Sequence, residues 1–275
     1  MVLQTAVEWM PGIEQMIASP GVIVAIGAVD VGKTSFCALL ASRSLESGIP
    51  TGVVDADMGQ SEIGPPTTIG MSTLKAPIHS LSDLHPRGLY FVGSTSPVGR
   101  IPAVLAGVRT LVEQAQELGA QQVIVDTTGL VKGVIARQLK THKIELLKPR
   151  HIVALQRSDE AEHFLRFFDT WKDCTIHRLP VSPEVHSKSQ TLRAQRRAVR
   201  FAEYFREART VDLRLDQYAT SCTYLRTGTP IESKYLKFIS TALRTETLHG
   251  EFIGGTATRP GGLYLVTASD YNKQG

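Results

Sequence analysis

The stretch VIVAIGAVDVGKTSF, Val22–Phe36, decides the fold class of this chain. It begins with an apolar run, Val22–Ile26, of the kind found in strands that are buried on both faces of a parallel sheet. The spacing G-x-x-x-x-G-K-[ST] follows at once, from Gly27 to Thr34, and residues 33–45 have helical character. A buried strand, a glycine-rich turn and a helix in this order are typical of a phosphate-binding loop. The stretch therefore predicts that the chain binds a nucleotide.

The residue types in this loop suit phosphate binding. Glycine permits the tight turn and lets backbone N–H groups approach phosphate oxygens, and the N-terminus of the following helix adds a favourable partial charge. The Lys33 ammonium can reach the terminal phosphates, and the Thr34 hydroxyl can ligate Mg²⁺. The predicted nucleotide-binding residues of the loop are Gly27, Asp30, Gly32, Lys33, Thr34 and Ser35.

The composition indicates an ordinary globular protein. Of the 275 residues, 42% are hydrophobic and 20% are charged, and the net charge of +4 is compatible with nucleic acid as a partner without requiring it. Cys37, Cys174 and Cys222 are far apart and offer no disulfide framework. We see no signal peptide, and no apolar run approaches the ~20 residues that cross a bilayer. We expect a cytoplasmic protein with no membrane association.

Strands and helices alternate outward from the loop. The expected strands are 22–26, 51–57, 89–94, 121–129, 151–157 and 174–182. The expected helices are 1–20, interrupted at Pro11, and 33–45, 101–118, 134–147 and 160–171. The stretch with Gly64, Pro65, Pro66 and Gly70 is turn-rich. This alternation predicts an α/β fold, a mostly parallel sheet with helices on both faces.

The character of the chain changes near Pro183. We expect residues 1–210 to form the phosphate-loop domain, with a polar and basic helix at about 187–209. Residues 211–275 are richer in Thr and Gly and predict a small β-containing appendage, with strands at 211–215 and 261–268.

Three carboxylates, Asp55, Asp57 and Asp126, stand at predicted strand ends. In doubly wound sheets those ends line the ligand crevice. A carboxylate there can hold the metal shell or accept a hydroxyl proton. A turn or N-cap role is the structural alternative for any one of them. Their position beside a phosphate loop favours a functional role for the set.

The segment KSQTLRAQRRAVRFAEYFREAR, residues 188–209, is rich in arginine. Wound as a helix, Arg193, Arg196, Arg197 and Arg200 fall on one arc of about 100°. Arginine matches phosphate with a planar donor fork, although most charge runs are solvated faces. Beside a phosphate loop, the segment predicts a lid that closes over transferring phosphates, as in small kinases.

These motifs together resemble those of the polynucleotide 5′-hydroxyl kinases. That family includes the RNA kinase of the pre-mRNA cleavage and tRNA-splicing machinery, the kinases of ribosomal-RNA spacer processing, and archaeal relatives. The loop GAVDVGKTS is similar to the family's GPTDVGKST, and further blocks follow in the family's order over about residues 21–206. The blocks are DADMGQ, FVGSTSPVG, VDTTGLVKG, IVALQR and KSQTLRAQRRAVRFAEYF.

The resemblance implies a P-loop kinase that moves the γ-phosphoryl group of ATP, with GTP as the alternative, to the 5′-OH of RNA or DNA. Mg²⁺ would be its cofactor, and single-stranded or end-exposed nucleic acid its partner. By the same resemblance, the catalytic residues would be Lys33, Asp57, Arg193 and Arg197, and Arg200 would contact the nucleotide. The metal ligands would be Thr34, Asp57 and Asp126. The acceptor-binding residues would be Gln60, Thr127, Thr128, Gly129, Leu130, Lys132 and Lys188.

The sequence departs from the family pattern at a few positions. Leu130 stands where eukaryotic relatives carry a Trp that stacks on the terminal base, a contact worth about 1–3 kcal/mol, so we expect weaker or less selective acceptor binding. Lys188 stands where an Arg is usual and loses bidentate recognition. Asp126 replaces an uncharged residue, so either it or Asp57 could be the base. Because the loop begins at Gly27, we expect a short form without the N-terminal β-domain of eukaryotic relatives.

Two other function classes stay open. Another P-loop enzyme, such as an assembly GTPase or a small-molecule kinase, would share the DVGKT loop, although the arginine lid favours a kinase and no His- or Cys-rich tract is present. A non-catalytic nucleic-acid-binding scaffold with a kinase fold is the second class. The intact Lys33, Thr34 and Asp57 argue against it. The sequence leaves open the choice between RNA and DNA and the oligomeric state.

Overall fold

In the computed structural model, the chain divides into two compact units, Met1–Ala208 and Arg209–Gly275. The structure describes residues 4–182, 185, 189–211, 228–254 and 262–267. The strand expected at 211–215 lies outside the described residues, apart from Val211. None of the helices in the described part of the chain combines the length and the apolar character that a bilayer span requires.

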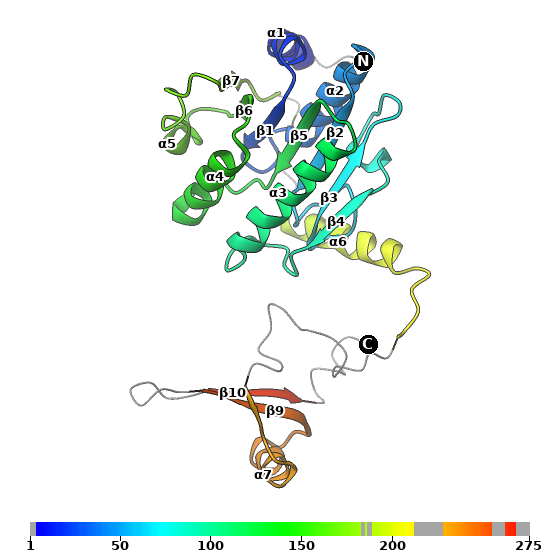
Figure 1. Ribbon diagram of the computed structural model, residues 1–275, viewed down its shortest axis with the longest axis vertical. Helices are drawn as coiled ribbons and strands as arrows, with labels where there is room; N and C mark the ends of the chain where they lie inside the picture. Colours follow the sequence, from blue (N-terminus) through cyan, green and yellow to red (C-terminus); the bar gives the residue numbers. More distant parts are fainter. Residues whose placement is uncertain (1–3, 183–184, 186–188, 212–227, 255–261, 268–275) are drawn as a thin grey trace. The chain divides into compact units, whose positions relative to one another are not determined.

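The first unit is built on a mixed sheet of seven described strands (Figure 1). These strands are β1 Val22–Gly27, β2 Thr51–Ala56, β3 Thr68–Thr73, β4 Gly88–Phe91, β5 Gln122–Thr127, β6 His151–Leu155 and β7 Thr175–Leu179. Their order is β4-β3-β2-β5-β1-β6-β7. Only β3 runs against the others, since it pairs antiparallel with both β2 and β4. The predicted α/β fold with a mostly parallel sheet is confirmed.

The helices cover both faces of this sheet (Figure 1). The helices of the first unit are α1 Gln4–Ala18, α2 Lys33–Glu46, α3 Ile101–Glu117, α4 Gly133–Leu147, α5 Glu162–Leu165 and α6 Gln190–Tyr204, and a short 3-10 turn, η1, spans Leu81–Asp83. Side chains of α1 and α2 share one buried apolar cluster with one face of the sheet. Side chains of α3, α4 and α5 share a second cluster with the other face.

The strand β3 is missing from the prediction. Its residues lie in the stretch whose glycines and prolines indicate turns. In the structure, Gly70 lies inside β3, and a Cβ at this position would collide with the carbonyl group of Ile63. Here glycine marks a close approach of two backbones and not the end of a strand.

Two helices also differ from their predictions. The prediction that Pro11 interrupts the first helix is wrong, because α1 continues through it. Pro11 is exposed, so water can satisfy the carbonyl that it leaves unbonded, while Trp9 and Ile13 anchor the opposite face in the core. The helix expected at 160–171 is regular only over α5. Beyond it, i→i+3 turns bury Phe168.

The order of the central strands positions the candidate site. The strands β2, β5 and β1 are neighbours and run in parallel. Their carboxyl ends therefore lie side by side, with Asp55 of β2 directly beside Asp126 of β5 in the ladder. The loop that follows β1 is the phosphate-binding sequence. A crevice at the carboxyl ends of parallel strands is where such sheets bind ligands.

The second unit contains α7 Ser233–Leu243 and a three-stranded antiparallel sheet. Its strands are β8 Thr229–Pro230, β9 Thr247–Ile253 and β10 Gly262–Thr267. The predicted β-containing appendage is confirmed, with β10 in the strand expected at 261–268. The helix α7 and the strand β9 are not among the expected elements.

A pair of buried histidines lies under α1 in the first unit. His151 Nε2 lies 2.8 Å from the Ser19 carbonyl oxygen, and His151 Nδ1 lies 3.1 Å from His177 Nε2. Because a carbonyl only accepts, His151 Nε2 carries the proton and His151 Nδ1 accepts from His177. Burial lowers the pKa of both rings, that of His177 to about 4. The neutral pair therefore joins β6, β7 and the turn before β1.

Acid is expected to destabilise the first unit through this pair. In the unfolded chain His177 binds a proton below about pH 6.5, whereas the folded pair resists it until about pH 4. The stabilisation is therefore present above pH 6.5 and is lost as the pH falls toward 4. His177→Gln keeps a donor and cannot titrate, so its urea midpoint should depend less on pH across this range. Equal slopes for the wild type and the variant would contradict this role.

Candidate active site

A pocket of about 420 Å³ lies around the phosphate-binding loop. Eight of the predicted site residues line it: Asp30, Gly32, Lys33, Thr34, Ser35, Asp57, Gln60 and Gly129. Arg196 of the predicted arginine arc also lines it, and five residues that sequence reasoning missed complete the wall: Val29, Val31, Glu62, Ser80 and Val185. The fold thus brings the loop, the segment after β2 and the segment after β5 to one cavity.

The loop is built as the sequence pattern requires. Gly27 lies so close to the Leu155 carbonyl that a Cβ would collide with it. Gly32 has φ +89°, in the left-handed region, and is the N-cap of α2. Lys33 is 7% exposed, and its ammonium donates to the Ala28 carbonyl oxygen at 2.7 Å. It is therefore held inside the loop that would surround the phosphates.

Thr34 and Asp126 form a direct pair. The Thr34 hydroxyl donates to Asp126 Oδ2 at 2.6 Å, and Asp126 Oδ1 is buried without a partner in the described part of the chain. Burial raises the pKa of Asp126 to about 6, although Lys33 and the Thr34 hydrogen bond oppose the shift. A hydroxyl and a buried carboxylate oxygen are ligands that Mg²⁺ prefers. These two residues therefore fit the predicted metal.

No group of three His, Cys, Asp or Glu side chains in the described residues could hold a metal ion by itself. In phosphoryl-transfer sites, one or two protein ligands usually hold Mg²⁺ together with the phosphates of the nucleotide. The sequence resemblance assigns Thr34, Asp57 and Asp126 to the metal. Of the two carboxylates, Asp126 is the one that accepts the hydrogen bond of the Thr34 hydroxyl.

Asp55 and Asp57 have different surroundings. Asp55 is buried and accepts from the backbone N–H groups of Asp57, Glu62 and Ile63 at 3.0, 2.6 and 3.0 Å. It therefore organises the turn after β2. Burial and the neighbouring Asp126 raise the pKa of Asp55 to about 8. The Asp57 side chain lines the pocket, and its Oδ1 accepts from the backbone of Gly59 and Gln60.

The segment Thr127–Gly129, which we call the clasp, lies between α4 and the phosphate loop. The Thr127 hydroxyl is fully buried, donates to the Ala25 carbonyl at 2.7 Å and does not line the pocket. Thr128 Oγ1 is buried and has no hydrogen-bond partner among the described residues. Gly129 touches Val29 of the loop, and a Cβ on it would lie 2.8 Å from the Val29 nitrogen. Of the clasp, Gly129 lines the pocket.

The remaining predicted acceptor residues lie further out. Leu130 is half-buried and Lys132, the N-cap of α4, is exposed; neither lines the pocket. Lys188 lies outside the described residues. The structure therefore brings Gln60 and Gly129 to the pocket, whereas Thr127, Thr128, Leu130 and Lys132 do not line it.

The arginine-rich segment forms the helix α6, which begins where the Ser189 side chain accepts from the Leu192 N–H. Its arginines contact the loop and the turn after β2. Arg193 pairs with Asp30 at 3.0 Å, and Arg196 pairs with Glu62 at 2.8 Å. Arg200 contacts the carboxylate of Glu62 at 3.5 Å and also its carbonyl oxygen.

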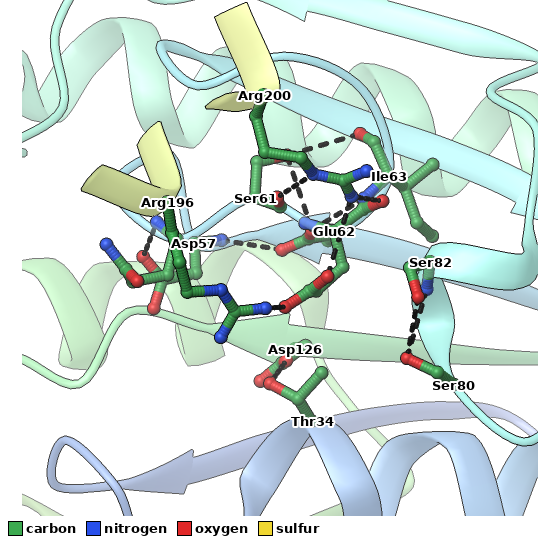
Figure 2. A network of polar contacts seen from close by, with 12 residues as sticks. Thr34, Asp57, Ser61, Glu62, Ile63, Ser80, Ser82, Asp126, Arg196 and Arg200 are labelled. Carbon is green, nitrogen blue, oxygen red and sulfur yellow. Dashed lines mark hydrogen bonds and ion pairs between the residues drawn. The ribbon is translucent and has the colours of Figure 1, made fainter. Parts of the chain in front are cut away.

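Figure 2 shows Arg196 and Arg200 converging on Glu62, with the Asp126–Thr34 pair nearby. Glu62 therefore pairs with two arginines of the predicted lid. Its only signal in the sequence is its place just after DADMGQ. Arg197 makes no hydrogen bond or ion pair with any described residue, and it lines a small cleft with Arg196 and Arg200. Of the four arginines on the predicted arc, it is the one without an ion pair to a described carboxylate.

Lys143 lies fully buried in α4, and its ammonium has no hydrogen-bond partner in the part of the chain that the structure describes. Burial lowers its pKa to about 8, although Asp57 and Asp126 oppose the shift. The unfolded chain therefore keeps Lys143 protonated up to about pH 10.5, whereas the folded protein keeps it protonated only up to about pH 8. The resulting loss in the free energy of unfolding is complete below pH 8 and disappears as the pH rises toward 10.5.

Lys143→Met is expected to stabilise the first unit. The methionine has a similar length and carries no charge, so the free energy of unfolding should rise by roughly 3 kcal/mol at pH 7. Because the penalty fades with rising pH, the gain should be less than about 1 kcal/mol at pH 10. Urea unfolding at the two pH values measures both. A variant that is less stable than the wild type at pH 7 would contradict this explanation.

Comparison with known proteins identifies the family of this chain. Residues 27–207 match the family model described as the mRNA cleavage and polyadenylation factor CLP1 P-loop. The chain is 34% identical over 235 residues to a polyribonucleotide 5′-hydroxyl-kinase of Pyrococcus furiosus and 32% identical over 238 residues to one of Pyrococcus horikoshii. Both alignments cover 86% of this chain. They cover 65% and 64% of the relatives, so the chain spans less than two thirds of their length.

Solved structures show the same fold. The chain resembles solved structures of Clp1p–Pcf11p complexes, with TM-scores of 0.54 and 0.56 at 17% identity. The matches cover 72% and 75% of this chain and 52% and 55% of Clp1p. At this identity the likeness concerns the fold alone.

Proposed function

Because this chain belongs to the family of the mRNA cleavage and polyadenylation factor CLP1 P-loop, we propose that it is an ATP-dependent polynucleotide 5′-hydroxyl kinase. The observation that carries the proposal is the meeting of three parts at one pocket. The pocket is bordered by the phosphate loop with Lys33 and Thr34, by the carboxylate of Asp57, and by the arginine-bearing helix α6. The names of the archaeal relatives support the same activity.

In the proposed reaction, the 5′-hydroxyl oxygen attacks the γ-phosphorus of ATP, and the bond to the bridging oxygen of ADP breaks. Asp57 orients the hydroxyl and takes its proton, since it lines the pocket and is not bonded to Thr34. Lys33 neutralises charge on the β- and γ-phosphates. Thr34 and Asp126 would hold Mg²⁺, which neutralises the same phosphates when bound.

The lid and the clasp position the two substrates. Arg193 and Arg197 would contact the transferring phosphoryl group, with α6 anchored on Asp30 and Glu62. Gln60, Thr128 and Gly129 would hold the 5′ end of single-stranded or end-exposed RNA or DNA. Because a free alcohol is a poor nucleophile, this positioning has to supply most of the acceleration.

The test measures whether ATP turnover requires a 5′-hydroxyl end. Purified protein with Mg²⁺ and ATP is given matched oligonucleotides that end in 5′-OH or in 5′-phosphate, as RNA and as DNA. We expect ADP release to rise with the 5′-OH ends and not with the 5′-phosphate ends. The ratio between RNA and DNA then names the acceptor. Turnover that ignores the end chemistry would indicate an NTPase or a kinase of another acceptor.

A further inference from the structure

The helix α4 carries two lysines on its buried face, Lys140 and Lys143, and both side chains are fully inaccessible to solvent. Lysine is almost never fully buried unless it is paired. Removing an ammonium from water costs several kcal/mol, and an apolar side chain of the same length would fill the space without that cost. Lys143 has no hydrogen-bond partner among the described residues, but Lys140 has two. The proposed reaction uses neither lysine.

Both partners of Lys140 belong to the clasp. Its Nζ donates to the Thr127 hydroxyl oxygen at 2.6 Å and to the Thr128 carbonyl oxygen at 2.7 Å. The Thr127 hydroxyl in turn donates to the Ala25 carbonyl of β1 at 2.7 Å. A line of hydrogen bonds therefore runs from α4 through the clasp to the strand that enters the phosphate loop.

The opposite end of the clasp borders the pocket. Gly129 lies against Val29 of the loop so closely that a Cβ would not fit. Thr128 Oγ1 and Asp126 Oδ1 are both buried without a partner in the described residues. Thr128 belongs to the clasp that Lys140 contacts, and Asp126 directly precedes it. A shift of this segment by a fraction of an ångström would therefore move groups at the site.

We propose that Lys140 is a positioning residue of the acceptor site, which fixes the backbone of the clasp so that Thr128 and Gly129 hold the 5′ end beside the phosphate loop. The inference rests on the proposed function. Burial, together with the charges of Lys143 and Lys33, lowers the pKa of Lys140. An uncharged amine still has two N–H donors, which the two hydrogen bonds require. The positioning therefore does not depend on the protonation state.

The test compares Lys140→Met with Lys148→Met, which removes an exposed lysine at the C-cap of the same helix. We measure kcat and KM for a 5′-OH oligonucleotide, the affinity for the oligonucleotide alone, and the affinity for ATP alone. Lys140→Met should lower kcat/KM for the acceptor by about 10- to 100-fold, weaken oligonucleotide binding, and leave the ATP affinity within about twofold. Lys148→Met should behave as the wild type.

A second variant separates positioning from folding. Thr127→Val removes the hydroxyl that Lys140 contacts, and the double variant should lose no more than Lys140→Met alone, because both changes break the same line of hydrogen bonds. Wild-type acceptor kinetics and oligonucleotide affinity in Lys140→Met would overturn the proposal, as would an equal loss of ATP affinity. If Lys140→Met does not fold, wild-type acceptor kinetics and binding in Thr127→Val overturn it.

The two proposals fail in different ways. A wild-type protein that binds the oligonucleotide but transfers nothing to it would remove the proposed function, and the binding measurements on the same variants would still decide the role of Lys140. A wild-type protein that transfers phosphate while Lys140→Met matches it would remove only the role of Lys140.

Discussion

Lys33→Met is expected to reduce phosphoryl transfer by about 10³-fold. The lysine is the cation of the phosphate loop, it lines the pocket, and its ammonium already lies within the loop at the Ala28 carbonyl. Removing one group that stabilises developing charge in a dry site costs about 10²–10³ in kcat, and a lysine at this position of a phosphate loop also contacts the nucleotide phosphates. Initial rates of label transfer from γ-labelled ATP measure the loss.

The control for Lys33→Met is Lys75→Met, which removes an exposed lysine far along the chain from the loop. It should retain the wild-type rate. The hydrogen bond of Lys33 stays within its own loop, so the melting temperature of Lys33→Met should be close to that of the wild type. A folded Lys33→Met that keeps most of the activity would remove the phosphate loop from the mechanism.

The second large effect separates the two carboxylates that the sequence leaves interchangeable. Asp57→Asn should lower kcat by about 10³-fold, within the range for loss of a general base, without changing the Mg²⁺ concentration at half-maximal rate. Asp126→Asn should instead raise that concentration at least about tenfold, because Asp126 is the carboxylate bonded to Thr34. Rates measured across a Mg²⁺ titration give both values for each variant.

The opposite result for the two variants would exchange the roles assigned to Asp57 and Asp126. If Asp126→Asn lost turnover at every Mg²⁺ concentration while Asp57→Asn shifted only the Mg²⁺ requirement, Asp126 would be the base. Asp57 Oδ1 also accepts from the backbone of Gly59 and Gln60. The stability of Asp57→Ala, which loses both hydrogen bonds, would then show how much of an Asp57 effect comes from folding.

The fold could be predicted wherever a local sequence pattern is typical of a single structure. The loop Gly27–Thr34 and the apolar runs of β1, β5 and β6 are where the sequence places them, and the resemblance to the kinase family is confirmed by the family match. The strand β3 was lost because Gly70 carries the signature of a turn while it serves a close backbone contact. A glycine gives the same signal in both cases, and only the neighbouring backbone tells them apart.

Only the site residues that belong to recognisable sequence motifs could be predicted. The arginine arc of α6 was visible in the sequence, but its receiving acid Glu62 was not, because the pairing spans more than a hundred residues. Lys140 was missed for a related reason. A lysine in a helix is read as a solvated side chain, and its burial against the clasp follows from the packing of α4 on the sheet. Sequence patterns identify the groups of a site more readily than the side chains that position them.

The central claim is that a phosphoryl group passes from a nucleotide to a nucleic-acid end. The most direct measurement uses γ-labelled ATP, Mg²⁺ and a 5′-OH oligoribonucleotide, followed by digestion to single nucleotides and location of the label. We predict that the label lies on the 5′-terminal nucleotide, that Lys33→Met gives none, and that a 5′-phosphorylated oligonucleotide accepts none. Label found only in free inorganic phosphate, or in a small-molecule product, would contradict the claim.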